Sequence, residues 1–309
     1  MKTRGRTVIG GILNHCYQRT VDGCLLFYST SDYLVFYTLF CTLAVNYQVN
    51  VLSLCLMPDH FHISIIVKRT EDLSGFMQTL TSCFARIRNQ ICHDTGQLFQ
   101  KPFGSVPIRG DKKARTNLCY IGNNGVERRL CEKAEDYRWN FLAYYNNKSP
   151  FSAPLIVRNA SNNMKKAVNE IRLHHKMSLP LSYYQLRRIF SNLNQKEKEQ
   201  LTDFIISSYN VIDYESACRF FDNYEDMLTA MHSNTGSEHD LNEVFIGRND
   251  LCYGKMISYI IKNIRPNDIH DILSLPAEQK YELFRRLSTH IEADPRQIAN
   301  CLRMPLKRA

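Results

Sequence analysis

Residues 51–67 read VLSLCLMPDHFHISIIV. The apolar, partly β-branched runs on either side of Pro58-Asp59 predict two strands, 49–57 and 60–67, joined as a hairpin. On a strand, residues i and i+2 point to the same face, so His60 and His62 share one face and Phe61 points to the other. Two imidazoles placed in this way can bind one divalent cation. His-x-His also occurs in strands as surface or hydrogen-bonded core histidines, and the motif alone leaves both interpretations open.

The segments around this hairpin alternate between strand and helix patterns. We expect further strands at 11–19, 23–28 and 105–108, and helices at 31–47, 74–93 and 114–123, the last of which ends at the Asn-Asn-Gly of 123–125. The order of these elements predicts an α+β fold, a ferredoxin-like antiparallel sheet with helices on one face.

The second half of the chain has a different pattern. A length of 309 residues suggests two domains. We expect a catalytic domain at 1–148, a linker rich in Asn, Ser and Pro at 149–163, and an all-helical domain at 164–309. Amphipathic helices are predicted at 181–190, 196–209 and 215–231, with an exposed loop at 232–242.

Two short helices are predicted near the C-terminus, at 276–291 and 295–303, with Asp294 as the cap and Pro295 at the first helical position. The segment 276–303 is a possible helix-turn-helix, whose second helix would present polar residues to DNA. The alternative is a helical hairpin that closes the domain core. The candidate DNA-reading residues are Arg296, Gln297, Asn300 and Arg303.

The charge balance favours an anionic partner. The chain has a formal charge of +9, and residues 1–150 hold 18 Lys and Arg against 11 Asp and Glu, whereas residues 151–309 hold 21 against 19. A basic N-terminal half fits a nucleic acid, although basic proteins without such a partner are common. The longest apolar stretch, 33–45, is too short to cross a membrane. The eleven irregularly spaced cysteines are typical of buried thiols in a reducing cytoplasm.

A tyrosine and an asparagine on the predicted helix 114–123 and at its end are further candidates. Tyr120 and Asn124 are four residues apart and therefore lie on one side of that helix. A phenol is a weak nucleophile unless a metal polarises the phosphate that it attacks. Tyr120 alone also fits core packing, and Asn124 alone also fits a helix C-terminus.

Taken in order, these segments resemble the single-tyrosine HUH transposases, and most closely their REP-associated tyrosine transposase branch. The family's Met-Pro-(Asn/Asp)-His-hydrophobic-His signature matches MPDHFH at 57–62. Four other blocks occur along residues 10–146 in the same order as in the family: HCYQRT at 15–20, LSGFMQTLTSCFARIRN at 73–89, GQLFQKPFGS at 96–105 and CYIGNNGVERRL at 119–130. The segment EDYRWNFLAYY at 135–145 resembles the closing element of the family.

The resemblance implies the ferredoxin-like fold and assigns roles to individual residues. His60, His62 and Asn124 correspond to the ligands of a divalent metal, Mg²⁺ or Mn²⁺, and Tyr120 to the nucleophile. The implied activity is cleavage and rejoining of single-stranded or hairpin DNA through a 5′-phosphotyrosine, in the cytoplasm at the nucleoid, by a monomer or a homodimer. The family's Asn-Pro-Val has Gly125 in place of proline here, and its Trp-Ser-Ser is Trp139-Asn140-Phe141.

Basic residues around these blocks are candidates for contact with DNA phosphates. Two alternatives to the transferase remain open: a catalytically silent DNA-binding regulator derived from a transposase, and a metal-dependent phosphodiesterase without a covalent step. The candidates in the N-terminal half are Arg19, Arg86, Arg88, Lys101, Arg109, Lys112, Lys113 and Arg115.

Overall fold

The computed structural model describes residues 7–100, 102–233 and 249–305. Its centre is an antiparallel sheet of four strands in the order β2-β3-β1-β4. This order, with a helix between β1 and β2 and another between β3 and β4, is that of the predicted ferredoxin-like fold. The strands are β1 (Leu13–Arg19), β2 (Asn50–Leu56), β3 (His60–Ile66) and β4 (Gly104–Ile108).

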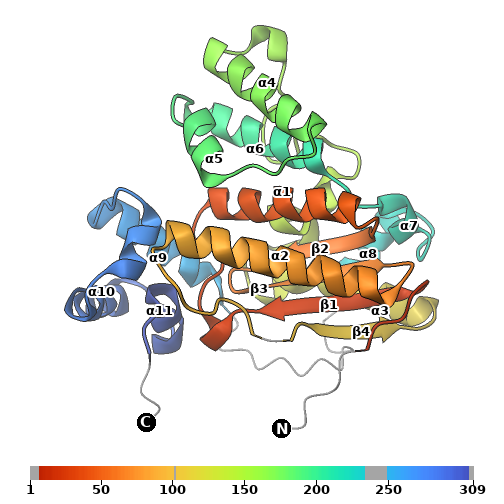
Figure 1. Cartoon of the computed structure of the whole chain (residues 1–309), viewed down its shortest axis with the longest axis horizontal. Helices are drawn as coiled ribbons and strands as arrows, with labels where there is room; N and C mark the ends of the chain where they lie inside the picture. Colours follow the sequence, from red (N-terminus) through yellow and green to blue (C-terminus); the bar gives the residue numbers. More distant parts are fainter. Residues whose placement is uncertain (1–6, 101, 234–248, 306–309) are drawn as a thin grey trace.

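Helices α1 (Thr30–Asn46) and α2 (Thr70–Ile91) share one face of the sheet, as predicted (Figure 1). Ser29 caps α1 in a capping box with Asp32. The helix is apolar on nearly all sides because it is buried twice, by the sheet on its inner side and by later helices on its outer side. Two contacts show the outer packing: Tyr37 donates to the Ile206 carbonyl, and Leu181 N–H donates to Thr38.

The helix expected at 114–123 is not on that face: helix α3 (Asp111–Glu127) packs against the opposite face of the sheet, where Ser64 of β3 hydrogen-bonds Asn117. The prediction that this helix ends at 123–125 is wrong, because Gly125 lies inside it. A Cβ atom at Gly125 would lie 2.9 Å from Cγ of Tyr137, and one at Gly122 would lie 2.7 Å from Sδ of Met231. These glycines therefore allow close packing and do not end the helix.

The later helices pack on the sheet domain in three groups. The first group covers α1, the second covers α3 and β2, and the third contacts Leu25 and Tyr28 in the loop before α1. The first group is α4 (Asn162–Lys176), α5 (Tyr183–Phe190) and α6 (Gln195–Tyr209); the second is α7 (Tyr214–Cys218) and α8 (Tyr224–Ser233); the third is α9 (Leu251–Asn263), η6 (Ile269–Ser274), α10 (Ala277–His290) and α11 (Pro295–Leu302).

The predicted linker also takes part in the packing. It contains η5 (Val157–Asn159) and the start of α4, and Phe151, Leu155 and Ala160 pack against the main core. The remaining short 3-10 turns are η1 (Val21–Gly23), η2 (Ala134–Asp136), η3 (Arg138–Asn140) and η4 (Leu142–Tyr144). The division of the chain at 148 and 163 stays a prediction.

Two predicted elements differ from the structure. Residues 23–28 do not form a strand, because Leu25 and Tyr28 pack into one hydrophobic cluster and Leu26 and Phe27 into another, so the segment lacks the alternation of a sheet. The predicted helix 215–231 is broken into α7 and α8. The predicted loop at 232–242 falls largely on residues outside the described ranges.

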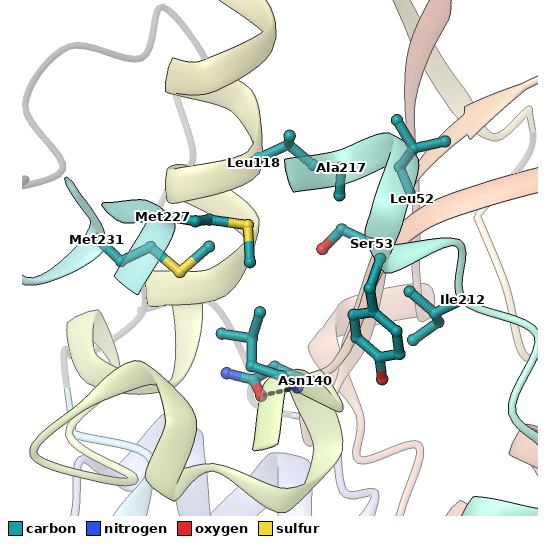
Figure 2. A pocket seen from close by; sticks show the side chains of 10 residues that line it. Leu52, Ser53, Leu118, Asn140, Ile212, Ala217, Met227 and Met231 are labelled. Atoms are coloured by element: carbon teal, nitrogen blue, oxygen red, sulfur yellow. Dashed lines mark hydrogen bonds between the residues drawn. The ribbon is translucent and has the colours of Figure 1, made fainter. Parts of the chain in front are cut away.

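The interior of the fold contains a small cavity near α3, and its cysteines are all thiols. A cavity of about 10 Å³ between β2, α3 and the second helical group has room for at most one water molecule, and no candidate catalytic or metal-ligating residue lines it (Figure 2). None of the eleven cysteines forms a disulfide. No helix within the described ranges is long and apolar enough to span a bilayer.

Candidate active site

The face of the sheet beneath α3 carries the predicted histidine pair. The side chains of His60 and His62 are both buried, and their ring centroids are 4.9 Å apart. The register of β1 against β3 pairs Arg19 with His60 and Tyr17 with His62. Because paired residues share a face, β1 adds a cation and a phenol to the same site.

Tyr120 of α3 completes this group from the other side. Its ring centroid is 5.5 Å from that of His62, in an edge-on arrangement. The ring also packs among Cys55, Met57 and Tyr137, and the residue is 5% exposed. A strand and a helix far apart in sequence thus bring the imidazoles and the phenol together, and the phenol is recessed.

The orientation of His60 depends on the turn before β3. Its Nδ1 lies 2.5 Å from Oδ1 of Asp59. Burial raises the pKa of the Asp59 carboxyl, but His60 and this hydrogen bond outweigh the effect, and the pKa lies below its ordinary value. The Nε2 atom of His60 is buried and has no hydrogen-bond partner among the described residues. A carboxylate that holds one imidazole nitrogen and directs the other inward is typical of a metal-binding histidine.

His62 is held by a third imidazole that the sequence argument did not single out. Its Nδ1 lies 3.0 Å from Nε2 of His15, on β1. Burial lowers the pKa of His62 well below its ordinary value, and the charges of His60, His15, Arg19 and Arg128 act in the same direction. His62 is therefore neutral at physiological pH, which is the form that binds a metal.

Asn124 is buried one turn after Tyr120, and its Nδ2 donates to the Tyr120 carbonyl at 2.8 Å. Its amide nitrogen is occupied by the helix, and its carbonyl oxygen is the atom suited to a hard cation.

These residues fit a divalent cation by the chemistry of their donors. The described part of the chain contains no cluster of three or more His, Cys, Asp or Glu side chains arranged to hold a metal. The predicted set has two imidazoles and one amide oxygen, so it does not form such a cluster. The fit rests on the buried Nε2 of His60, directed by Asp59.

The predicted DNA-contacting residues fall in different places. Arg19 lies in the site, with its guanidinium 5.8 Å from the centroid of the Tyr17 ring. Four others are exposed around the start of α3, beside the end of β4, where Ile108 pairs with Leu13. Leu13 stands at one end of β1, four residues from Tyr17 and six from Arg19, the partners of His62 and His60, so this end of the sheet lies about 14–20 Å from the histidines. The four are Arg109, Lys112, Lys113 and Arg115.

The remaining candidates of the N-terminal half are not brought to the site. Arg86 is exposed on α2, beyond the opposite face of the sheet. Arg88 is fully buried and donates to the Leu25 carbonyl at 3.0 Å, so its guanidinium is not on a surface that DNA can contact. Lys101 lies outside the described residues.

The contacts of α11 favour the helical hairpin over the helix-turn-helix. Gln297 is buried and donates to the Asn249 carbonyl at 2.9 Å. Arg303 forms an ion pair with Asp94, and a Cβ atom at Gly23 would lie 3.2 Å from Nδ2 of Asn300. Arg296 is the one of these four residues that is exposed. Most of the polar side of α11 therefore faces its own chain.

The structure also adds an ion pair that the sequence argument missed. Arg128, two helical turns after Tyr120 at the C-terminal end of α3, lies 3.4 Å from both carboxylate oxygens of Asp250, before α9. Burial raises the pKa of Asp250 to about 6, although Arg128 opposes the shift. Arg128 could have been found from the sequence, because the four-residue spacing from Tyr120 to Asn124 continues to it along one side of the helix. Nothing in the local sequence indicates that Asp250 lies near Arg128. His15 was detectable, because His15, Tyr17 and Arg19 alternate along one strand.

A ferredoxin-like sheet with two buried imidazoles beneath a helix-borne tyrosine defines a candidate phosphoryl-transfer site. Comparison with protein families agrees with this class: residues 27–124 match the family described as "Transposase IS200 like". The predicted resemblance to the single-tyrosine transposases is therefore confirmed over this range, which includes His60, His62, Tyr120 and Asn124. The match covers about a third of the chain.

One solved structure also shows similarity. It is described as "Structure of the REP associates tyrosine transposase bound to a REP hairpin", and it shares 17% sequence identity with this chain. The alignment covers 45% of this chain and 81% of that chain, with a TM-score of 0.39. A comparison with curated proteins finds no match.

Proposed function

We propose that this protein is a metal-dependent single-strand DNA endonuclease and strand transferase that acts through a 5′-phosphotyrosine at Tyr120. The observation that carries the proposal is the convergence of Tyr120 with the buried histidine pair, at a centroid distance of 5.5 Å from His62. A protein that only bound DNA would need neither the buried imidazoles nor the phenol beside them. The match to a transposase family over these residues supports the same class.

The proposed chemistry is a transesterification. The Tyr120 oxygen attacks the scissile phosphorus and loses its proton, the bond from phosphorus to the 3′ oxygen breaks, and that oxygen takes up a proton as a 3′-hydroxyl. The phosphodiester energy is kept in the tyrosine linkage, so a 3′-hydroxyl of another strand can reverse the reaction and join. A divalent cation held by His60, His62 and Asn124 supplies positive charge for the phosphate; two imidazoles suit Mn²⁺ at least as well as Mg²⁺.

The proposed substrate is hairpin-containing or single-stranded DNA. Arg19 lies in the site, and we expect it and the exposed basic group at the start of α3 to contact DNA phosphates. The similar structure contains a REP hairpin, which is the kind of DNA that we propose to test first. Because Tyr120 is 5% exposed, a phosphate reaches it only after a local rearrangement.

The test uses a labelled hairpin oligonucleotide with single-stranded flanks, incubated with the full chain and Mn²⁺ or Mg²⁺. We expect cleavage and a protein–DNA adduct that survives denaturation. Tyr120→Phe should lose both, since the phenol oxygen is the nucleophile. Tyr17→Phe is the matched control, because it removes the other phenol near His62 and should keep the adduct.

Two results would overturn the proposal. Cleavage that persists in Tyr120→Phe without an adduct would show a phosphodiesterase that uses water. Tight binding with no cleavage under any metal condition would show a DNA-binding regulator.

A further inference from the structure

His15 is a buried imidazole that lies against both parts of the candidate site. It is 1% exposed, its ring centroid is 5.2 Å from that of His62, and it is 5.7 Å from that of Tyr120. Its position follows from the strand register, because His15 on β1 pairs with Ser64 on β3, two residues beyond His62 on the same face. None of the roles assigned above to the metal-binding set uses this residue.

The contact between the two imidazoles restricts their protons. Nε2 of His15 and Nδ1 of His62 are 3.0 Å apart, which is a hydrogen-bond distance. One of the two nitrogens must carry the hydrogen and the other must accept it. Since a neutral imidazole has a single N–H, the direction of this bond determines which nitrogen of His62 has the lone pair.

Only one direction of this hydrogen bond is compatible with metal binding at Nε2 of His62. If His62 donates from Nδ1, its Nε2 has the lone pair that a cation requires, and His15 must then carry its own hydrogen on Nδ1. If His15 donates from Nε2 instead, the hydrogen of His62 moves to its Nε2 and a cation cannot bind there. Partners of this kind fix both the tautomer and the ring orientation of metal-binding histidines.

We propose that His15 is a positioning residue that holds His62 in the Nδ1–H tautomer and thereby prepares Nε2 of His62 for a divalent cation. The inference rests on the proposed metal site but concerns a residue outside the ligand set. It also gives the two ligands a parallel construction, in which Asp59 accepts from Nδ1 of His60 and His15 accepts from Nδ1 of His62. An anionic and a neutral acceptor thus have the same role for neighbouring ligands.

The geometry suggests a pair of substitutions that separates this role from simple packing. His15→Gln keeps an acceptor oxygen that can reach the position of Nε2, whereas His15→Leu fills similar space without an acceptor. We expect His15→Leu to weaken Mn²⁺ binding by about 10–100-fold, as is usual when the partner of a ligating histidine is lost. We expect His15→Gln to retain most of the wild-type affinity.

The first measurement is Mn²⁺ affinity, from the electron paramagnetic resonance signal of free Mn²⁺ titrated with metal-free protein. The second is the ¹⁵N NMR spectrum of the His62 ring in metal-free protein, assigned with His62→Asn. We expect the Nδ1–H tautomer in wild type and His15→Gln, and its loss in His15→Leu.

The two measurements separate the possible failures. An Nε2–H tautomer in wild type, or a His15→Leu variant that binds Mn²⁺ as tightly as wild type does, would overturn the role of His15. Wild type that shows the Nδ1–H tautomer but does not bind Mn²⁺ would support the role of His15 and overturn the metal site of the proposed function. The NMR result in wild type stands even if His15→Leu fails to fold.

Discussion

The described part of the protein contains two buried histidine centres, and the neighbours of the histidine shift its pKa in opposite directions in the two. At His62, burial and nearby cations and imidazoles lower the pKa well below its ordinary value. At His270, in η6, burial also lowers the pKa, but Asp32 and Asp268 outweigh it and raise the pKa to about 9. An imidazole is therefore neutral at His62, beneath α3, whereas it is a cation at His270, between two carboxylates.

This difference separates the chemical role that we propose for the centre at His62 from a structural role of the centre at His270. Nε2 of His270 lies 2.9 Å from Asp32, whose other oxygen accepts from the backbone N–H groups of Tyr28 and Ser29 at the start of α1. Tyr183 of α5 also donates to Asp32. The centre at His270 thus joins α1, α5 and the third helical group, whereas the centre at His62 presents neutral nitrogens beside a tyrosine.

The largest effect that we expect within this comparison is on folding. Asp32→Asn removes the anion between His270 and the start of α1, and breaking a buried ion pair from one side typically costs about 3–5 kcal/mol. We expect the free energy of unfolding, measured with urea, to fall by this order, and Mn²⁺ affinity of the folded protein to be unchanged. The control Asp72→Asn, in an exposed pair with Arg69, should change stability little. Equal stability of Asp32→Asn and wild type would remove the structural role from this centre.

The second effect is a pH dependence of stability. Since the pKa of His270 is higher in the folded protein than its ordinary 6.5, its contribution is fully present below about pH 6.5 and is lost as the pH rises through about 9. The difference in unfolding free energy between wild type and His270→Asn should therefore shrink over this range. A difference that stays constant or grows with pH would show that His270 is neutral in the folded protein.

A smaller effect, on metal affinity, is expected at the centre formed by His60 and His62. Asp59→Ala removes the acceptor that orients His60, and the affinity for Mn²⁺ should fall by about 10–100-fold. Asp111→Ala removes an exposed carboxylate at the start of α3 and serves as the control for the change in net charge. If both substitutions changed the affinity alike, the effect would be one of charge alone and not of imidazole orientation.

Short-range patterns predicted much of the sheet and of the site. The period of two places His60 and His62 on one face, and the period of a helix places Tyr120 and Asn124 on one side, so both halves of the site were visible locally. The turn at Pro58-Asp59 and the capped start of α1 are likewise local features.

The rest depends on contacts between distant segments. His270 and Asp32 are 238 residues apart, and Arg128 and Asp250 are 122 apart, so no local pattern pairs them. Arginine is usually a surface residue, yet Arg88 is buried because the Leu25 carbonyl and the Tyr28 ring surround it. The Asn-Asn-Gly sequence at 123–125 is typical of a helix end, yet α3 continues past it, and Gly125 allows the close approach of Tyr137.

The most direct test of the central claim is to map the tyrosine that becomes linked to DNA. After reaction with hairpin DNA and Mn²⁺, nuclease and trypsin digestion should leave a phosphorylated nucleotide on peptide 116–128, whose single tyrosine is Tyr120. Peptide 7–19, whose single tyrosine is Tyr17, should stay unmodified. Modification of the second peptide, or of neither while the DNA is cleaved, would contradict the assignment of Tyr120 as the nucleophile.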